Sequence, residues 1–315
     1  MKNTHGETIR EELTRRIRSG SSPLTCISTG ETARLKILSG VSAVVFDVYG
    51  TMMISGVGDI GVDDGSIAPE DIADAFERSG ITFTDPDRSK RKSAGRKILQ
   101  SYNETVFNTC EKAREAGNPH PEPEIRSVWS RVLSNMQEDG LLRFSDAADT
   151  AARVSVEFEV RMNPVWPMPC LAETLQTLRE RAFILGIISN SQFYTPLMIE
   201  ALAGSSLNEL GFSPGLLHWS YEEGMKKPGM IFYEGFLRKL ESHQPKLKPE
   251  HVLYVGNDML KDILPAHKLG MKTALFAGDA RSLKWREDVQ ECREVKPDLV
   301  VTDLKQIPGC LEERG

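Results

Sequence analysis

The stretch VSAVVFDVYGT, residues 41–51, decides the fold. Its first seven residues, 41–47, are mostly β-branched, aromatic or small and run together until Gly50 interrupts the pattern, which is typical of a strand buried on both faces. This strand ends on a carboxylate, Asp47. In open parallel sheets ligands bind beyond the carboxyl ends of the strands, so Asp47 stands where a reactive residue is expected.

Two different patterns follow this strand. Up to about residue 165 the sequence is helical, and we expect helices near 69–80, 87–115, 124–136 and 145–158. After residue 166 amphipathic helices alternate with apolar strands, which we expect at FILGIIS (183–189), LLHWS (216–220), HVLYVG (251–256), KTALFAG (272–278) and DLVVTD (298–303). Such alternation predicts a parallel sheet covered by helices on both faces.

One strand before a helical block and at least four after it indicate a single α/β core with an insertion. Because the insertion begins directly after Asp47, it is expected to cover the site as a lid. The predicted core comprises 1–52 and 166–315, and the predicted helical cap is 53–165. Residues 1–40 form an N-terminal extension in which Ile9, Leu13 and Ile17 are spaced as one face of a short helix; packing on the core and a dimer contact are both open.

Composition narrows the possible partners. The chain has 315 residues, 40% of them hydrophobic and 27% charged, with a formal net charge of -6. These values are typical of a globular protein with room for about two domains and argue against a nucleic-acid partner. No apolar run is long enough for a membrane span. Five scattered cysteines fit a reducing compartment, so we expect a cytoplasmic monomer or homodimer that binds a small, anionic molecule.

Polar residues follow several of the predicted strands and form one constellation. They are Asp47, Ser189, Asn190, Lys227, Asn257, Asp258 and Asp262. The ends of neighbouring parallel strands meet at one edge of a sheet, so these groups are expected to converge. A carboxylate with an ordinary pKa near 3.9 is ionised at neutral pH and attacks phosphorus or carbon without a base. Lys227 would neutralise it, and Ser189 with backbone amides would hold the transferred group.

These segments resemble the four motifs of the haloacid dehalogenase superfamily, in the same order. The matching stretches are FDVYGT (Asp47 to Thr51), IISNS (with Ser189 and Asn190), GMKKP (with Lys227) and VGNDMLKD (with Asp258 and Asp262). The resemblance extends over most of 41–303. It implies a Rossmann-like core with an inserted α-helical cap, Asp47 as the nucleophile, Ser189 and Lys227 as residues that orient substrate and balance charge, and magnesium at the fourth motif in the phosphatase branches.

Two departures from the family pattern point to different reactions. Tyr49 stands where the family's phosphatases carry an aspartate that protonates the leaving group, and the family's dehalogenases also carry tyrosine there. Halide leaves without a proton, so this position favours a carbon–halogen substrate. The fourth motif favours a phosphatase: Asp258 and Asp262, with Asp47 and the Tyr49 carbonyl, would hold magnesium, although Asn257 replaces the usual first aspartate.

The reading that reconciles both departures is a magnesium-dependent phosphotransfer enzyme whose substrate has a good leaving group. The alternatives are a metal-independent 2-haloacid dehalogenase, which would need a cation such as Arg88, Arg91 or Arg96, and a catalytically silent binding protein. Lys226 is expected to be a solvated surface lysine. The GxGxxG match at Gly56, Gly58 and Gly61 lacks the strand-to-helix turn of a dinucleotide site and is read as a loop at the mouth of the site.

Overall fold

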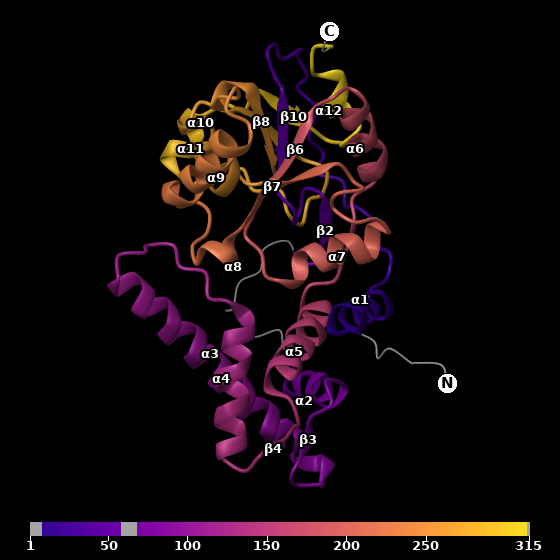
Figure 1. The fold of residues 1–315 in the computed structure, drawn as a ribbon, viewed down its shortest axis with the longest axis vertical. Helices are drawn as coiled ribbons and strands as arrows, with labels where there is room; N and C mark the ends of the chain where they lie inside the picture. Colours follow the sequence, from indigo (N-terminus) through magenta and orange to yellow (C-terminus); the bar gives the residue numbers. More distant parts are fainter. Residues whose placement is uncertain (1–7, 58–67, 314–315) are drawn as a thin grey trace.

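The computed structural model describes residues 8–57 and 68–313, and its centre is a six-stranded parallel sheet (Figure 1). The strand order is β10-β9-β8-β1-β6-β7, and every adjacent pair is parallel. The strands are β1 (Ala43–Phe46), β6 (Ile184–Ser189), β7 (Phe212–Trp219), β8 (Val252–Gly256), β9 (Lys272–Phe276) and β10 (Leu299–Val301). The predicted α/β fold with a parallel sheet is therefore confirmed.

Both faces of the sheet are buried, as the uninterrupted apolar strands predict. Along β1, Val44 and Phe46 pack into one hydrophobic cluster while Ala43 and Val45 pack into another. The helices that follow the strands are α6 (Leu171–Glu180), α7 (Tyr194–Ala203), α8 (Ser220–Glu223), α9 (Met230–His243), α10 (Leu264–Lys268), α11 (Gln290–Glu294) and α12 (Gln306–Gly309). Within the described residues no helix combines the length and apolarity needed to cross a bilayer.

A second layer of helices, which we call the helical insert, extends away from the sheet (Figure 1). It consists of α2 (Pro69–Arg78), α3 (Arg91–Glu115), α4 (Ile125–Glu138) and α5 (Ala147–Met162), with short strands β3 (Thr82–Phe83) and β4 (Leu142–Arg143). Its own core centres on Trp129, which is fully buried and packs against the rings of Phe76, Tyr102 and Phe158. These residues belong to the same hydrophobic cluster as Val44 and Phe46 of β1, so the insert and one face of the sheet share a continuous core.

The chain passes from the core into the insert and back through two short strands that lie side by side. These are β2 (Met53–Ser55) and β5 (Val165–Pro167), which pair antiparallel. The sequence did not predict them, because strands of three residues are too short for a periodic signal. The fourth predicted helix also differs: it ends at Met162 rather than near 158. Gly58 and Gly61 of the GxGxxG match lie outside the described residues.

The N-terminal helix α1 (Ile9–Gly20) connects the insert to the core. A capping box between Thr8 and Glu11 starts this helix, and its predicted apolar stripe buries Leu13 and Ile17. Helix α1 packs against both α5 and α7, and Arg16 forms an ion pair with Glu157 of α5. Part of the N-terminal extension therefore packs within this chain, which was one of the two open possibilities.

Candidate active site

Asp47 follows the central strand of the sheet directly. Strand β1 lies between β6 and β8, and the backbone N–H of Asp47 donates to the carbonyl of Val255, which continues the ladder by one residue. A tight turn comes next, where Gly50 has a φ of +83° and a Cβ atom would lie 2.5 Å from Ser282. Glycine adopts this backbone readily and leaves room for the approach. The carboxylate of Asp47, only 6% exposed, reaches the surface of a cavity.

Lys227 is the partner that the sequence predicted for Asp47. Its Nζ atom lies 2.6 Å from Oδ1 of Asp47 and 2.6 Å from Oδ1 of Asp262. The loop that carries it is fixed by Asn190, whose Oδ1 accepts from the backbone N–H of Lys227 at 2.8 Å and whose Nδ2 donates to the Lys227 carbonyl. Two of the predicted strand-end segments thus contact the ammonium group of Lys227, and a third holds its backbone.

Two buried carboxylates share this single ammonium. Burial alone lowers the pKa of Lys227, but the nearby Asp262 and Asp47 carboxylates outweigh it and raise the pKa overall. Burial raises the pKa of Asp262 to about 6, although Lys227 acts in the opposite direction. Asp262 can pack directly against the backbone of Gly256 because glycine has no side chain: a Cβ atom at Gly256 would lie 2.4 Å from the Asp262 Cγ. Lys227 is therefore held charged, with Asp47 as its partner at the cavity.

The remaining fourth-motif groups do not present the oxygens expected for magnesium. Nε of Arg286 donates to both carboxylate oxygens of Asp258, each at 3.1 Å, so the two side chains form a bidentate ion pair. Oδ1 of Asp258 also accepts hydrogen bonds from two backbone N–H groups. Oδ2 of Asp262 accepts the backbone N–H groups of Asn257 and Asp258, and Oδ1 of Asn257 accepts from Thr51 at 3.0 Å.

These contacts engage most of the donor set that the sequence suggested. Over 8–57 and 68–313, no three His, Cys, Asp or Glu side chains gather as a metal site. The expected set of Asp47, Tyr49, Asn257, Asp258 and Asp262 fits magnesium poorly in this arrangement. Ammonium, guanidinium and amide groups contact carboxylate oxygens of Asp47, Asp258 and Asp262 that a hard cation would need.

Tyr49 lines the same cavity as Asp47. Its hydroxyl group hydrogen-bonds to Oγ1 of Thr195 at 2.8 Å. Burial raises the pKa of Tyr49 well above 10, and the carboxylates of Glu159 and Asp47 add to this effect. A phenol that holds its proton so tightly is a poor general acid at neutral pH.

Ser189 and Thr51 are fully buried and are not part of the cavity lining. The hydroxyl of Ser189 donates to the carbonyl of Asn190, and that of Thr51 donates to Asn257. The residues that face the cavity after β6 are Asn190, Ser191 and Gln192. In this arrangement Ser189 and Thr51 are placed to support the loops, whereas the sequence suggested that both meet the substrate.

The cavity between the sheet and the insert has a volume of about 380 Å³, which is ample for a small metabolite. Sequence reasoning missed several of its lining residues, among them Tyr102, Glu122, Phe158, Glu159, Lys261 and Lys284. Lys226 also lines it, although its side chain is 41% exposed, and its Nζ lies 3.9 Å from Glu122. Arg88, Arg91 and Arg96 are absent from the lining.

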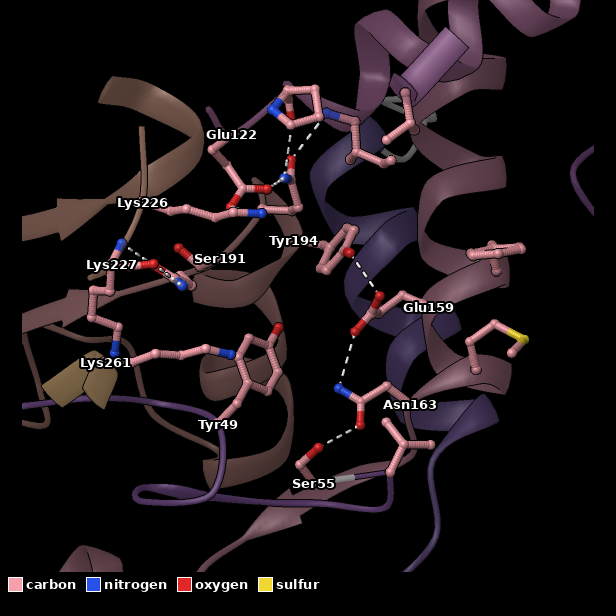
Figure 2. A pocket seen from close by; sticks show the side chains of 18 of the residues that line it. Tyr49, Ser55, Glu122, Glu159, Asn163, Ser191, Tyr194, Lys226, Lys227 and Lys261 are labelled. Atoms are coloured by element: carbon pink, nitrogen blue, oxygen red, sulfur yellow. Dashed lines mark hydrogen bonds and ion pairs between the residues drawn. The ribbon is translucent and has the colours of Figure 1, made fainter. Parts of the chain in front are cut away.

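Two glutamates of the insert line the cavity, of which Glu159 is buried and Glu122 is half-buried. Glu122 accepts a hydrogen bond from Gln192 at 2.8 Å and lies near Lys226. Glu159 of α5 accepts a hydrogen bond from the Tyr194 hydroxyl at 2.7 Å (Figure 2). Burial raises the pKa of both carboxyls. A signal for Glu159 existed: Ser155, Phe158, Glu159 and Met162 share one helical face, so an acid interrupts an otherwise buried stripe.

The second half of the core is similar in sequence to a known family, and the whole chain is similar in fold to a solved structure. Residues 224–307, which include Lys227, Asp258 and Asp262, match a family described as HAD-hydrolase-like. The structure aligns with a 2-haloacid dehalogenase from Pseudomonas syringae pv. tomato DC3000 at a TM-score of 0.51 and 19% identity, over 86% of this chain and 97% of that one. Residues 224–307 are therefore similar in sequence to this hydrolase family, and the chain as a whole is similar in fold to the dehalogenase.

Other solved structures align less closely. The L-2-haloacid dehalogenase of Xanthobacter autotrophicus aligns at a TM-score of 0.44 and 19% identity, over 85% of this chain and 97% of that one. A HAD phosphatase from Thermococcus onnurineus aligns at 0.44 and 14%, over the same shares of the two chains. No curated protein sequence matches the chain. At 19% identity the likeness to the Pseudomonas dehalogenase shows the fold alone, so the reaction depends on the site.

Proposed function

We propose that this protein is a hydrolase in which Asp47 attacks a small, anionic phosphoryl compound and carries the phosphoryl group until water removes it. The observation that carries the proposal is the Asp47–Lys227 pair at the end of a 380 Å³ cavity whose lining holds three further lysines, Lys226, Lys261 and Lys284. Fixed positive charge stabilises a transferring phosphoryl group more strongly in a covered site than in water. The proposal keeps the predicted division into a core of 1–52 and 166–315 and a cap of 53–165.

The properties of Tyr49 determine what kind of leaving group the substrate can have. No carboxylic acid stands at that position, and the phenol is too weak an acid to protonate a departing alkoxide. The bond from phosphorus to the leaving group must therefore break without a proton from Tyr49. An acyl phosphate or a similarly activated ester meets this requirement, because its leaving group is stable as an anion. No step of this scheme is assigned to magnesium, since Asp258 is paired with Arg286.

Metal-independent dehalogenation of a 2-haloacid is the second candidate, and Tyr49 together with the Asp258–Arg286 pair favours it. In that reaction the Asp47 oxygen displaces halide from carbon, and no cation is needed at the fourth motif. The lysines of the cavity lining would then have to bind the substrate carboxylate, because Arg88, Arg91 and Arg96 do not line the cavity.

A panel of acyl phosphates, alkyl phosphates and 2-haloacids, each with magnesium or with chelator, tests the proposal. We expect phosphate release that is fastest with the acyl phosphates and that Asp47→Asn abolishes. Halide release that ignores the chelator would reject phosphoryl transfer in favour of the second candidate. A wild type that turns over no member of the panel, at the level of the Asp47→Asn background, would instead support the silent binding protein.

A further inference from the structure

Glu159 is a buried acid in the cavity that has no cationic partner in the part of the chain that the structure describes. It is 5% exposed, and the influences on its carboxyl group are burial and two hydrogen bonds, with no lysine or arginine among them. Glu122, the other glutamate of the lining, differs because Lys226 and Lys261 both offset its charge. A buried carboxylate without a cation costs several kcal/mol of desolvation, so its position calls for an explanation.

The carboxylate of Glu159 is held in one orientation by a chain of hydrogen bonds (Figure 2). Tyr194 donates to Oε2 at 2.7 Å, and Nδ2 of Asn163 donates to Oε1 at 3.2 Å. Ser55 in turn donates to Oδ1 of Asn163 at 2.8 Å, which fixes the amide so that its NH2 group faces Glu159. Each carboxylate oxygen accepts one of these bonds and keeps a further lone pair for a ligand.

Aromatic side chains surround this part of the cavity. Tyr49, Tyr102, Phe158 and Tyr194 all belong to the lining, and the rings of Tyr102 and Phe158 lie 5.5 Å apart. The faces of aromatic rings attract cations, and rings gathered around a carboxylate are suited to a substituted ammonium group. Glu159 and Asp47 both raise the pKa of Tyr49, and all three residues line the same cavity.

The two ends of the cavity therefore differ in what they attract. In Figure 2, Lys226, Lys227 and Lys261 extend from the core, whereas Ser55, Asn163 and Glu159 lie on the opposite side, with Tyr49 and Tyr194 between them. An anionic group suits the lysine end, and a cationic group suits the glutamate end. A single small molecule that carries both charges satisfies the whole cavity.

We propose that the substrate carries a protonated amine at the end remote from the reacting group, and that Glu159 with its surrounding aromatic rings binds this amine. The substrate class is thus a zwitterion, an activated phosphoryl derivative of a small amino compound. This inference rests on the proposed function for the identity of the anionic end, while the amine site stands on Glu159 and the rings.

Binding without turnover tests the inference. The probes are a homologous series of ω-aminoalkylphosphonates and the ω-hydroxyalkylphosphonates of equal length, titrated calorimetrically into the full-length protein. At the best length we expect the amine to bind about tenfold more tightly than its hydroxyl counterpart, the scale of a desolvated cation–aromatic contact. We expect Glu159→Gln to remove this preference, and the matched variant Glu122→Gln to retain it.

Several outcomes would overturn the inference. They are equal affinity for the two series in the wild type, no detectable binding of either series, and a preference that survives in Glu159→Gln. The wild-type comparison decides even if Glu159→Gln proves unstable, and Tyr194→Phe, which removes one hydrogen bond to Glu159, should weaken the preference partially. Asp47-dependent turnover with no amine preference would defeat this inference alone, whereas an amine preference without such turnover would defeat the proposed function alone.

Discussion

The cavity is bounded by two carboxylate sites that are built differently. On the side of the sheet, Asp47 and Asp262 share the ammonium group of Lys227, with both contacts at 2.6 Å. On the side of the insert, Glu159 is held by a hydroxyl and an amide but by no cation within the described residues. The first site is compensated before any ligand arrives. The second is completed only by a ligand, which suggests that the core supplies the chemistry and the insert selects the substrate.

The largest expected effect comes from removing the reactive group and leaving its surroundings. Asp47→Asn keeps the size of the side chain but replaces a charged nucleophile with a neutral amide. We expect turnover to fall by at least about a thousandfold, since nucleophile replacements in comparable enzymes cost this much or more. The measurement is steady-state turnover, with thermal unfolding as the control for folding. Activity within about tenfold of the wild type would contradict the assignment of Asp47.

Lys227→Met should break the compensated site itself. It leaves two buried carboxylates with no cation, and removing one partner of a buried ion pair typically costs about 3–5 kcal/mol of unfolding free energy. Denaturant unfolding measures this loss. Lys226→Met is the matched control: its side chain is 41% exposed and lies 3.9 Å from Glu122, so a change below about 1 kcal/mol is expected. Equal losses in the two variants would refute the contrast.

The uncompensated site should reveal itself through pH. Burial raises the pKa of Glu159 above its ordinary value of 4.5, so the folded protein binds this proton more tightly than the unfolded chain does. The stabilising contribution of protonated Glu159 to the free energy of unfolding is therefore present at acidic pH. It is lost as pH rises through 4.5 toward the raised pKa. We expect Glu159→Gln to gain stability relative to the wild type as pH increases over this window. Parallel stability profiles for the two proteins would speak against an ionisable, uncompensated Glu159.

A smaller effect concerns the fourth motif. Arg286→Gln frees the carboxylate of Asp258 from its bidentate partner, whose side chain is 25% exposed, so a stability loss of about 1 kcal/mol is expected. The freed oxygens should also improve the site for a hard cation. Magnesium should then raise the melting temperature of Arg286→Gln more than that of the wild type. An equal or larger shift in the wild type would show that the Asp258–Arg286 pair does not limit metal binding.

The sequence could predict the compensated site because it depends on the sheet. Asp47 follows β1 and Lys227 follows β7, which are separated only by β6 in one parallel sheet, and the carboxyl ends of such strands meet at the same edge. Glu159 could not be placed in the same way, since its position depends on how α5 packs over the core. Arg286 belongs to a loop without periodic pattern, so nothing in the sequence indicated that it pairs with Asp258. Short strands such as β2 and β5 likewise leave too few residues for a pattern.

The most direct test of the account is the identity of the covalent adduct on Asp47. The wild type is mixed briefly with an acyl phosphate that it turns over, quenched in acid and digested, and the peptide containing Asp47 is analysed by mass spectrometry. The account predicts one added phosphoryl group on Asp47, absent when Asp47→Asn is treated identically. An unmodified peptide during active turnover, or a phosphoryl group on any other residue, would contradict it.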